Sequence, residues 1–227
     1  MNVELLVYTP DPEKIVAIAA KLCYSDSTIK EVEEKFYNEE ERKRLINLLL
    51  EKNHLSPFEH ITFTFGIEGI SRACSHQLVR HRIASYSMQS QRYVKFKNEV
   101  GYIIPISIGN STLLEEYKKY ILEGQKLYEK MIENKIKPED ARYIFHNAIT
   151  TNIIATFNAR SLFNFFELRC CFHAQREIWL LANKMLSLVK KVAPNVFSKA
   201  GRTCFNYGYC RENDNKCSNY KYIINKN

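Results

Sequence analysis

Two segments of the sequence alternate apolar and polar side chains with the two-residue period of a β-strand. In ITFTFGI, residues 61–67, the apolar side chains face one way, whereas Thr62 and Thr64 face the other. Residues 152–158 show the same alternation. Strands of this kind are buried on one face only, so the fold must cover one side of a β-sheet.

Helical patterns interleave with these strands. Further short strands are predicted at residues 3–8 and 102–105. The predicted helices cover residues 12–24, 40–52, 71–82, 112–134, 138–145, 159–170 and 173–192. The interleaving predicts an α/β fold of the mixed α+β kind, with a central, mostly antiparallel sheet flanked by helices. We expect one domain over residues 1–195, followed by a polar, loosely packed tail at 196–227.

Local signals predict details of three helices. Asp11 is the expected N-cap of the first helix, with Pro12 at the first helical position. In the second helix, Leu45, Leu48 and Leu49 are expected on one face. The helix at 112–134 is expected to begin with a capping box formed by its first and fourth residues, Thr and Glu.

Composition narrows the possible partners. The 227-residue chain carries a net charge of +8, which favours anionic partners. It contains seven cysteines but no CxxC pair, a composition typical of a reduced, cytoplasmic protein. No signal peptide begins the sequence, and no apolar run reaches the length of about 18 residues that a membrane span needs. We therefore expect no membrane partner.

Two clusters contain residues that could bind a metal ion, but neither has a regular spacing. HLSPFEH, residues 54–60, does not match the HxxEH pattern, and Pro57 interrupts a continuous helix. Cys204, Cys210 and Cys217 are irregularly spaced and have no obvious fourth ligand. The sequence therefore predicts no metal site.

The stretch RHRIASYSMQSQRY contains a concentrated set of anion-binding side chains. Gln77, Arg80 and His81 are spaced three and four apart and would share a helix face, whereas Arg80 and Arg82 would point apart. The RHR triplet is therefore expected at a helix end. Ser90 and Arg92 in the following loop suit a phosphate group, because a hydroxyl and a bidentate cation both bind its oxygens.

A third cluster lies in the apolar segment NARSLFNFFELR. Arg160 and Asn164 are i and i+4 on one face, and Arg169 lies roughly 140° further round the helix. Arginines in such a segment need an anionic partner. That partner is either a ligand or a carboxylate such as Glu167 or Glu177.

Three classes of function are compatible with these clusters. A nucleic-acid-binding module would need a continuous basic face with stacking aromatics, whereas here the arginines lie among Asn, Ser and Gln. A structural oligomer would use the arginines only in ion pairs. The mixture of side chains favours an enzyme that binds small ligands, with no nucleic-acid partner.

The sequence resembles the flavin-dependent thymidylate synthases. Their signature is RHR, seven residues and then Ser, and residues 80–90 match it without a gap. Residues 54–60, PEDAR, NARSL and HAQREI also resemble family segments, in the family's order. The similarity runs from about residue 1 to residue 194.

The resemblance implies a reaction, its cofactor and an assembly. dUMP, 5,10-methylenetetrahydrofolate and NADPH would give dTMP and tetrahydrofolate, with FAD carrying the hydride. A homotetramer with active sites at subunit interfaces is also implied. The implied dUMP contacts are Gln77, Leu78, Val79, Arg80, Met88, Gln89, Ser90, Gln91, Arg92, Arg142 and Arg169, the last being catalytic. The implied FAD contacts are Ser56, Arg80, His81, Arg82, Met88, Asn158, Ala159, Arg160 and Asn164.

Two features bear on how closely the chain follows the family. Ser87 and Met88 stand where the family often has a polar pair such as Asn-Glu. Cys170 and Cys171 follow Arg169 but would lie about 100° and 200° round the helix from it. We therefore expect no cysteine nucleophile.

Overall fold

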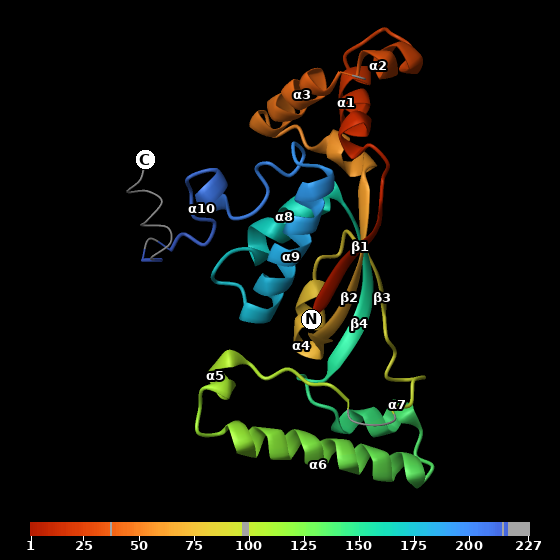
Figure 1. Ribbon diagram of the computed structural model, residues 1–227, viewed down its shortest axis with the longest axis vertical. Helices are drawn as coiled ribbons and strands as arrows, with labels where there is room; N and C mark the ends of the chain where they lie inside the picture. Colours follow the sequence, from red (N-terminus) through yellow and green to blue (C-terminus); the bar gives the residue numbers. More distant parts are fainter. Residues whose placement is uncertain (37, 97–99, 215, 218–227) are drawn as a thin grey trace. The chain divides into compact units, whose positions relative to one another are not determined.

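The four strands of the fold form one antiparallel sheet (Figure 1). The computed structural model describes residues 1–36, 38–96, 100–214 and 216–217. The strand order is β1-β2-β4-β3, so the fold is mixed α+β, as predicted. The strands are β1 (Asn2–Tyr8), β2 (Thr62–Ser71), β3 (Ser85–Met88) and β4 (Thr150–Asn158).

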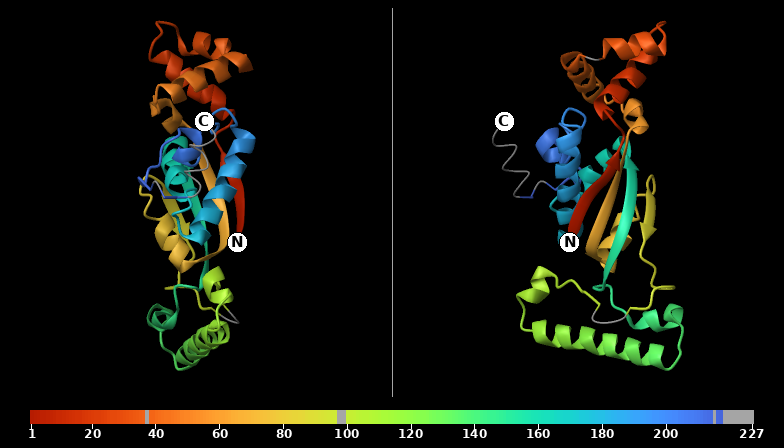
Figure 2. Two further views of the ribbon diagram at one scale, coloured as in Figure 1. Left: turned by 90° about the vertical axis from the view of Figure 1, so that its left-hand side faces the viewer. Right: turned by 45° about the vertical axis from the view of Figure 1, so that its right-hand side comes forward.

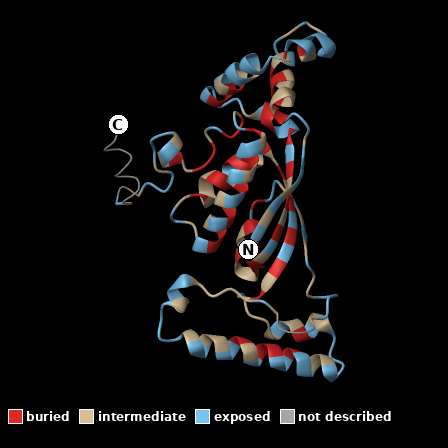
Figure 3. Ribbon diagram, viewed as in Figure 1, coloured by how far each residue is buried: buried red, intermediate tan, exposed pale blue. Residues whose placement is uncertain are grey.

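Alternation along the two central strands confirms the pattern predicted from the sequence. Phe63, Phe65 and Ile67 are at most 1% exposed, as are Phe157 and Ala155 on β4. On the opposite face the Thr64 and Thr156 hydroxyls lie 2.9 Å apart. Figure 3 shows the alternation of buried and exposed positions along the strands.

The chain forms two compact units. The first consists of residues 1–3, 66–82 and 86–155, and the second of residues 4–65, 83–85 and 156–227. The helices of the first unit are α4 (Arg72–Leu78), α5 (Ile106–Gly109), α6 (Leu114–Glu133), α7 (Pro138–Ala141) and the 3-10 helix η2 (Arg142–Ile144). Those of the second are α1 (Pro12–Leu22), α2 (Ile29–Lys35), α3 (Glu39–Glu51), η1 (Ser56–His60), α8 (Ala159–Arg169), α9 (Arg176–Val192) and α10 (Thr203–Asn206).

Aromatic side chains form the core of the second unit. Helices α8 and α9 lie side by side (Figure 2). Phe165 of α8 packs on Phe157 of β4 at a centroid distance of 5.7 Å. Phe63 of β2 meets Phe197 at 5.2 Å, edge to face. Strands β2 and β4 therefore each contribute an aromatic ring that packs against another part of the second unit.

The position of Phe197 shows that the start of the predicted tail is well packed. Val196 and Phe197 are fully buried, and Ala200 and Thr203 are at most 4% exposed. The prediction of loose packing was wrong for residues 196–203. It was based on the polar composition of the whole segment, which does not reveal the few apolar residues that are buried. Residues 218–227 of the predicted tail lie outside the described residues.

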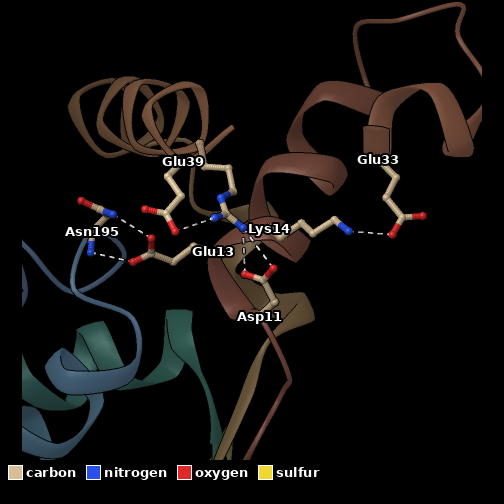
Figure 4. Close-up of polar contacts among 7 residues, drawn as sticks. Asp11, Glu13, Lys14, Glu33, Glu39 and Asn195 are labelled. Carbon is tan, nitrogen blue, oxygen red and sulfur yellow. Dashed lines mark hydrogen bonds and ion pairs between the residues drawn. The ribbon is translucent and has the colours of Figure 1, made fainter. Parts of the chain in front are cut away.

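Polar contacts anchor helix α1 to its neighbours in the second unit (Figure 4). Glu13 accepts two hydrogen bonds of 2.7 Å from the backbone and side-chain nitrogens of Asn195. Asp11 accepts from Arg42 of α3. Asp11 is at the predicted N-cap position, but its side chain makes no capping bond, and its φ of 44° is left-handed.

Helix α6 contributes the main apolar face of the first unit. Ile121 and Tyr128 are 1% exposed, and Tyr128 stacks on Phe145 at 4.4 Å. The predicted capping box at its start was wrong: the helix begins at Leu114 without a side-chain cap. Ser111 instead accepts a hydrogen bond from the Leu113 amide and forms the turn.

Three other local predictions were also corrected. In α3 the buried face contains Ile46, Leu49 and Leu50, whereas Leu48 is 48% exposed. The stretch predicted as loop up to Arg92 contains strand β3. The strand predicted at 102–105 is reduced to an isolated bridge from Tyr102. Among the described helices, none combines the length and apolar composition needed to cross a membrane.

Candidate functional site

The RHR triplet lies just beyond the end of α4. Ser71 caps the start of the helix by accepting a hydrogen bond from the Cys74 amide, and the helix ends at Leu78. Placement of RHR at a helix end is therefore confirmed. The prediction that Gln77, Arg80 and His81 share one helix face was wrong, since His81 is buried whereas Arg80 is exposed. The helix has ended before Arg80, so helical spacing no longer applies there.

Tyr86 fixes the backbone on which the triplet stands. Its hydroxyl lies 3.0 Å from the Leu78 carbonyl oxygen and 2.8 Å from that of His81 and donates toward both. Burial raises the pKa of this phenol, so it remains a donor at neutral pH. Within the part of the chain that the structure describes, Arg80 and Arg82 make no hydrogen bond or ion pair. Both guanidinium groups can therefore bind an anion.

The loop after β3 places Arg92 against a carboxylate. The Gln89 amide donates to the Asn152 carbonyl at 2.9 Å and thereby attaches the loop to β4. The Ser90 hydroxyl accepts from the Arg92 amide at 3.1 Å. The side chain of Arg92 donates from Nε to Glu139 Oε2 at 2.7 Å.

Several cations surround Glu139. Arg142 donates from Nε to the Glu139 carbonyl at 3.0 Å, which leaves its terminal nitrogens for another partner. The hydrogen bond from Arg92 lowers the pKa of the Glu139 carboxyl, and the charges of Arg92, Lys137 and Arg142 lower it further. Burial, and secondarily the charge of Arg142, lowers the pKa of Arg72. This part of the first unit therefore has an excess of positive charge.

In the second unit, η1 and the start of α8 form a polar surface. Phe58 of η1 packs edge to face on Phe163 of α8 at 5.8 Å, which brings the two helices together. Arg160 then forms an ion pair with Glu59. Neither of the carboxylates suggested from the sequence, Glu167 and Glu177, is the partner of Arg160.

Polar groups beside this ion pair have hydrogen-bonding capacity to spare. The Asn158 side-chain oxygen caps α8 by accepting from the Ser161 amide at 2.8 Å, which leaves its amide nitrogen available. Ala159 is buried, and its amide donates to the Ile61 carbonyl. Ser56 and Asn164 are exposed.

Arg169 is the last residue of α8 and is half-buried. The next residue, Cys170, is 2% exposed, and burial raises the pKa of its thiol to about 12. A thiol in that state is protonated at neutral pH and is a poor nucleophile.

The two units hold different parts of the predicted site. The first contains these predicted nucleotide contacts: Gln77, Leu78, Val79, Arg80, Met88, Gln89, Ser90, Gln91, Arg92 and Arg142. The second contains Arg169 and these predicted flavin contacts: Ser56, Asn158, Ala159, Arg160 and Asn164.

Comparison with known proteins establishes the family. Residues 4–195 match the family described as "Thymidylate synthase complementing protein". The chain belongs to this family. It is 49% identical to a flavin-dependent thymidylate synthase of Clostridium tetani, over 96% of this chain and 93% of the relative. It is 46% identical to one of Geobacter sulfurreducens, over 96% and 94%. A Sulfurisphaera tokodaii relative of the same name is 44% identical over 90% and 79%.

Four residues that lie beside the predicted site residues were not predicted from the sequence. Glu139 and Glu59 lie inside motifs that were recognised, PEDAR and HLSPFEH, but neither was assigned a partner. Arg72 precedes the RHR triplet and was not counted with it. Tyr86 had no signal in the sequence, because its partners are backbone carbonyls.

Proposed function

We propose that this protein is a flavin-dependent thymidylate synthase that methylates dUMP reductively to dTMP. 5,10-Methylenetetrahydrofolate would donate the carbon, NADPH the reducing equivalents, and tetrahydrofolate would be released. The observation that best supports this proposal is the cation cluster around Glu139, in a chain that belongs to the family. A nucleotide phosphate is a dianion, and such a cluster suits it.

In this proposal the first unit binds the nucleotide. Arg92 and Arg142 neutralise the phosphate, and Ser90 and loop amides donate hydrogen bonds to it. Glu139 is the partner of Arg92 when the phosphate is absent. The remaining nucleotide contacts come from Gln77, Leu78, Val79, Arg80, Met88, Gln89 and Gln91.

Arg169 is the proposed catalytic residue. Its guanidinium would hydrogen-bond the edge of the uracil ring and stabilise negative charge at N3 and O2, which makes C5 nucleophilic. No cysteine need attack the ring. The buried, protonated thiol of Cys170 supports a mechanism without a cysteine nucleophile.

The donor set on η1 and α8 fits FAD. A guanidinium, two side-chain amides and a hydroxyl can bind a pyrophosphate and the polar edges of a dinucleotide. Ser56, Asn158, Ala159, Arg160 and Asn164 would hold the cofactor, together with Arg80, His81, Arg82 and Met88. Bound FAD would supply hydride-transfer chemistry, which no side chain provides.

We further propose a cytoplasmic homotetramer with active sites at subunit interfaces. All seven cysteines are free, which is consistent with a reducing compartment. Large apolar side chains such as Tyr143 and Ile83 are 85% and 76% exposed in the single chain, which is consistent with subunit contacts. Sedimentation of a flavin-bound monomer at micromolar concentration would contradict the tetramer.

An assay of tritium release from 5-tritiated dUMP tests the proposal. The purified protein should be yellow, and it should release tritium only when methylenetetrahydrofolate and a reduced nicotinamide are both supplied. A colourless protein that cannot take up FAD, or release that is independent of added folate, would contradict the proposed reaction.

A further inference from the structure

Three metal-ligating side chains of the second unit come together from two distant parts of the chain. His173 lies in the connection between α8 and α9, and Asp214 and Cys217 lie after α10. Each offers one ligand atom, and these three atoms all lie within 4.8 Å of one another. Among the described residues, no other group of three or more His, Cys, Asp or Glu side chains meets this condition. None of the three is a predicted nucleotide or flavin contact.

Hydrogen bonds hold the segment that carries the carboxylate and the thiol. Arg211 donates to the Glu167 carboxylate of α8 at 2.7 Å, which attaches the start of the segment to that helix. The Lys216 amide donates to Asp214 Oδ1 at 2.9 Å, and the Cys217 amide donates to the Asp214 carbonyl at 3.3 Å. The carboxylate is therefore oriented through Oδ1, and Oδ2 is left to face another partner.

The imidazole of His173 has a defined partner at each of its nitrogens. Nε2 lies 2.9 Å from Asp214 Oδ2, and Nδ1 lies 3.5 Å from Cys171 Sγ. A neutral imidazole carries a single proton, so only one nitrogen donates at a time. When Nδ1 carries the proton and directs it at the Cys171 sulfur, Nε2 presents its lone pair on the side of Asp214 and can bind a metal ion.

We propose that His173 Nε2, Asp214 and Cys217 bind one zinc ion, with a water molecule as the fourth ligand. Nitrogen, carboxylate oxygen and thiolate are the ligand types of zinc in proteins, whereas Mg²⁺ and Ca²⁺ take oxygen ligands. Three protein ligands and a water form an open tetrahedral zinc site. His173 is exposed and the other two ligands are half-buried, which leaves room for the water.

Small movements are enough to form this site. Two ligand atoms of a tetrahedral zinc lie about 3.3 Å apart for a nitrogen and an oxygen, and about 3.5 Å apart where one of them is sulfur. The 2.9 Å contact from His173 to Asp214 would open by about 0.4 Å, and the Cys217 sulfur would approach by at most about 1.3 Å. Binding would release the thiol proton of Cys217, because the thiolate is the ligand.

The ion would fasten the segment after α10 to the connection that follows α8. The sequence analysis grouped Cys217 with Cys204 and Cys210, whereas the structure places it beside a histidine 44 positions earlier (217 − 173). His173 lies four positions after Arg169 (173 − 169), so the ion would also restrain the chain that follows this arginine. Zinc binding itself does not depend on the proposed reaction.

Zinc content of the purified protein tests the proposal independently of activity. Wild type loaded with Zn²⁺ and then desalted should retain about one ion per chain. Cys217→Ser, Asp214→Ala and His173→Gln should each lower zinc affinity at least about tenfold in competition with a chelating dye. Cys210→Ser is the matched control from the same part of the chain and should bind zinc as tightly as wild type.

Cobalt titration of wild type keeps the test valid even if a variant fails to fold. Co²⁺ should give the visible bands of a tetrahedral site and a thiolate charge-transfer band, and Zn²⁺ should abolish both. The charge-transfer band should persist in Cys171→Ser, whose hydroxyl still accepts from Nδ1, and should disappear in Cys217→Ser.

Two results would overturn the proposal. The first is wild type that retains no zinc and gives no cobalt bands. The second is zinc lost as completely from Cys171→Ser or Cys210→Ser as from Cys217→Ser, because the ion would then have a different set of ligands.

Discussion

Arg92 in the first unit and Arg160 in the second each pair with a glutamate distant in sequence, but their surroundings differ. Arg160 and Glu59 form an ion pair of one cation and one anion. At Glu139, Arg92 is joined by Lys137 and Arg142, and all three lower the pKa of a single carboxyl. The second region is therefore close to balanced in charge, whereas the first carries an excess of positive charge.

This difference indicates which part of a ligand each region suits. An excess of positive charge stabilises a phosphate dianion, because several guanidinium groups can share it. A balanced pair surrounded by amides and hydroxyls suits a larger polar molecule whose contacts are mostly hydrogen bonds. The comparison supports nucleotide binding in the first unit and flavin binding on η1 and α8.

The largest expected effect comes from Arg169→Ala. The Arg169 side chain lies in the second unit but is proposed to act on the uracil ring. Its loss should therefore reduce turnover and leave flavin binding intact. Turnover should fall by about a hundred- to a thousandfold, because charge stabilisation in the transition state is lost. The variant should stay yellow. Arg44→Ala, at an exposed arginine of α3, is the control and should be fully active.

Arg142→Ala should have the next largest effect. Losing one charge-assisted contact costs about 1.5–3 kcal/mol, so dUMP affinity should fall roughly ten- to a hundredfold. FAD affinity should change much less. In Arg160→Ala, titration of both ligands should show that FAD affinity falls more than dUMP affinity. Equal loss of both ligands in either variant would remove the distinction between the two regions.

Glu139→Gln should change affinity in the opposite direction. Since Glu139 holds Arg92 when no phosphate is bound, removing its charge should tighten dUMP binding by about three- to tenfold. Glu59→Gln is the matched variant in the second unit and should leave dUMP affinity unchanged. Weaker dUMP binding by Glu139→Gln would mean that the carboxylate positions Arg92 for the substrate.

The smallest effect is expected at Cys170. Cys170→Ala should keep turnover within about tenfold, or about 1.4 kcal/mol in the barrier. Its folded thiol has a pKa of about 12, whereas an unfolded one titrates near about 8.5. The unfolded chain therefore loses this proton first, and wild type should lose stability as pH rises between these values. Denaturant titrations at several pH values should show that the free energy of unfolding falls less with rising pH in Cys170→Ala than in wild type.

The sequence predicted features that depend on local periodicity and missed those that depend on distant partners. Alternation identified β2 and β4, and the two-residue spacing of Arg80 and Arg82 predicted that RHR lies at a helix end. The pairing of Arg160 with Glu59 spans 101 positions and that of Arg92 with Glu139 spans 47, so no helical or strand spacing encodes either. Phe197 was missed because one buried ring in a polar segment leaves no periodic signal.

For the predicted site, too, the sequence did not reveal features that depend on residues distant in the chain. Composition and motif order indicated an anion-binding enzyme and its residues. The excess of charge around Glu139 became visible only when helix α7 was placed beside the loop that carries Arg92.

Calorimetry on two ligands tests whether the cations near Glu139 bind the nucleotide phosphate. Wild type should bind dUMP at least about a hundredfold more tightly than deoxyuridine, which lacks the phosphate. In Arg142→Ala that ratio should fall roughly tenfold or more, with deoxyuridine affinity unchanged. If the ratio stays the same in Arg142→Ala, or deoxyuridine binding falls in parallel with dUMP binding, the phosphate is not held by this cluster.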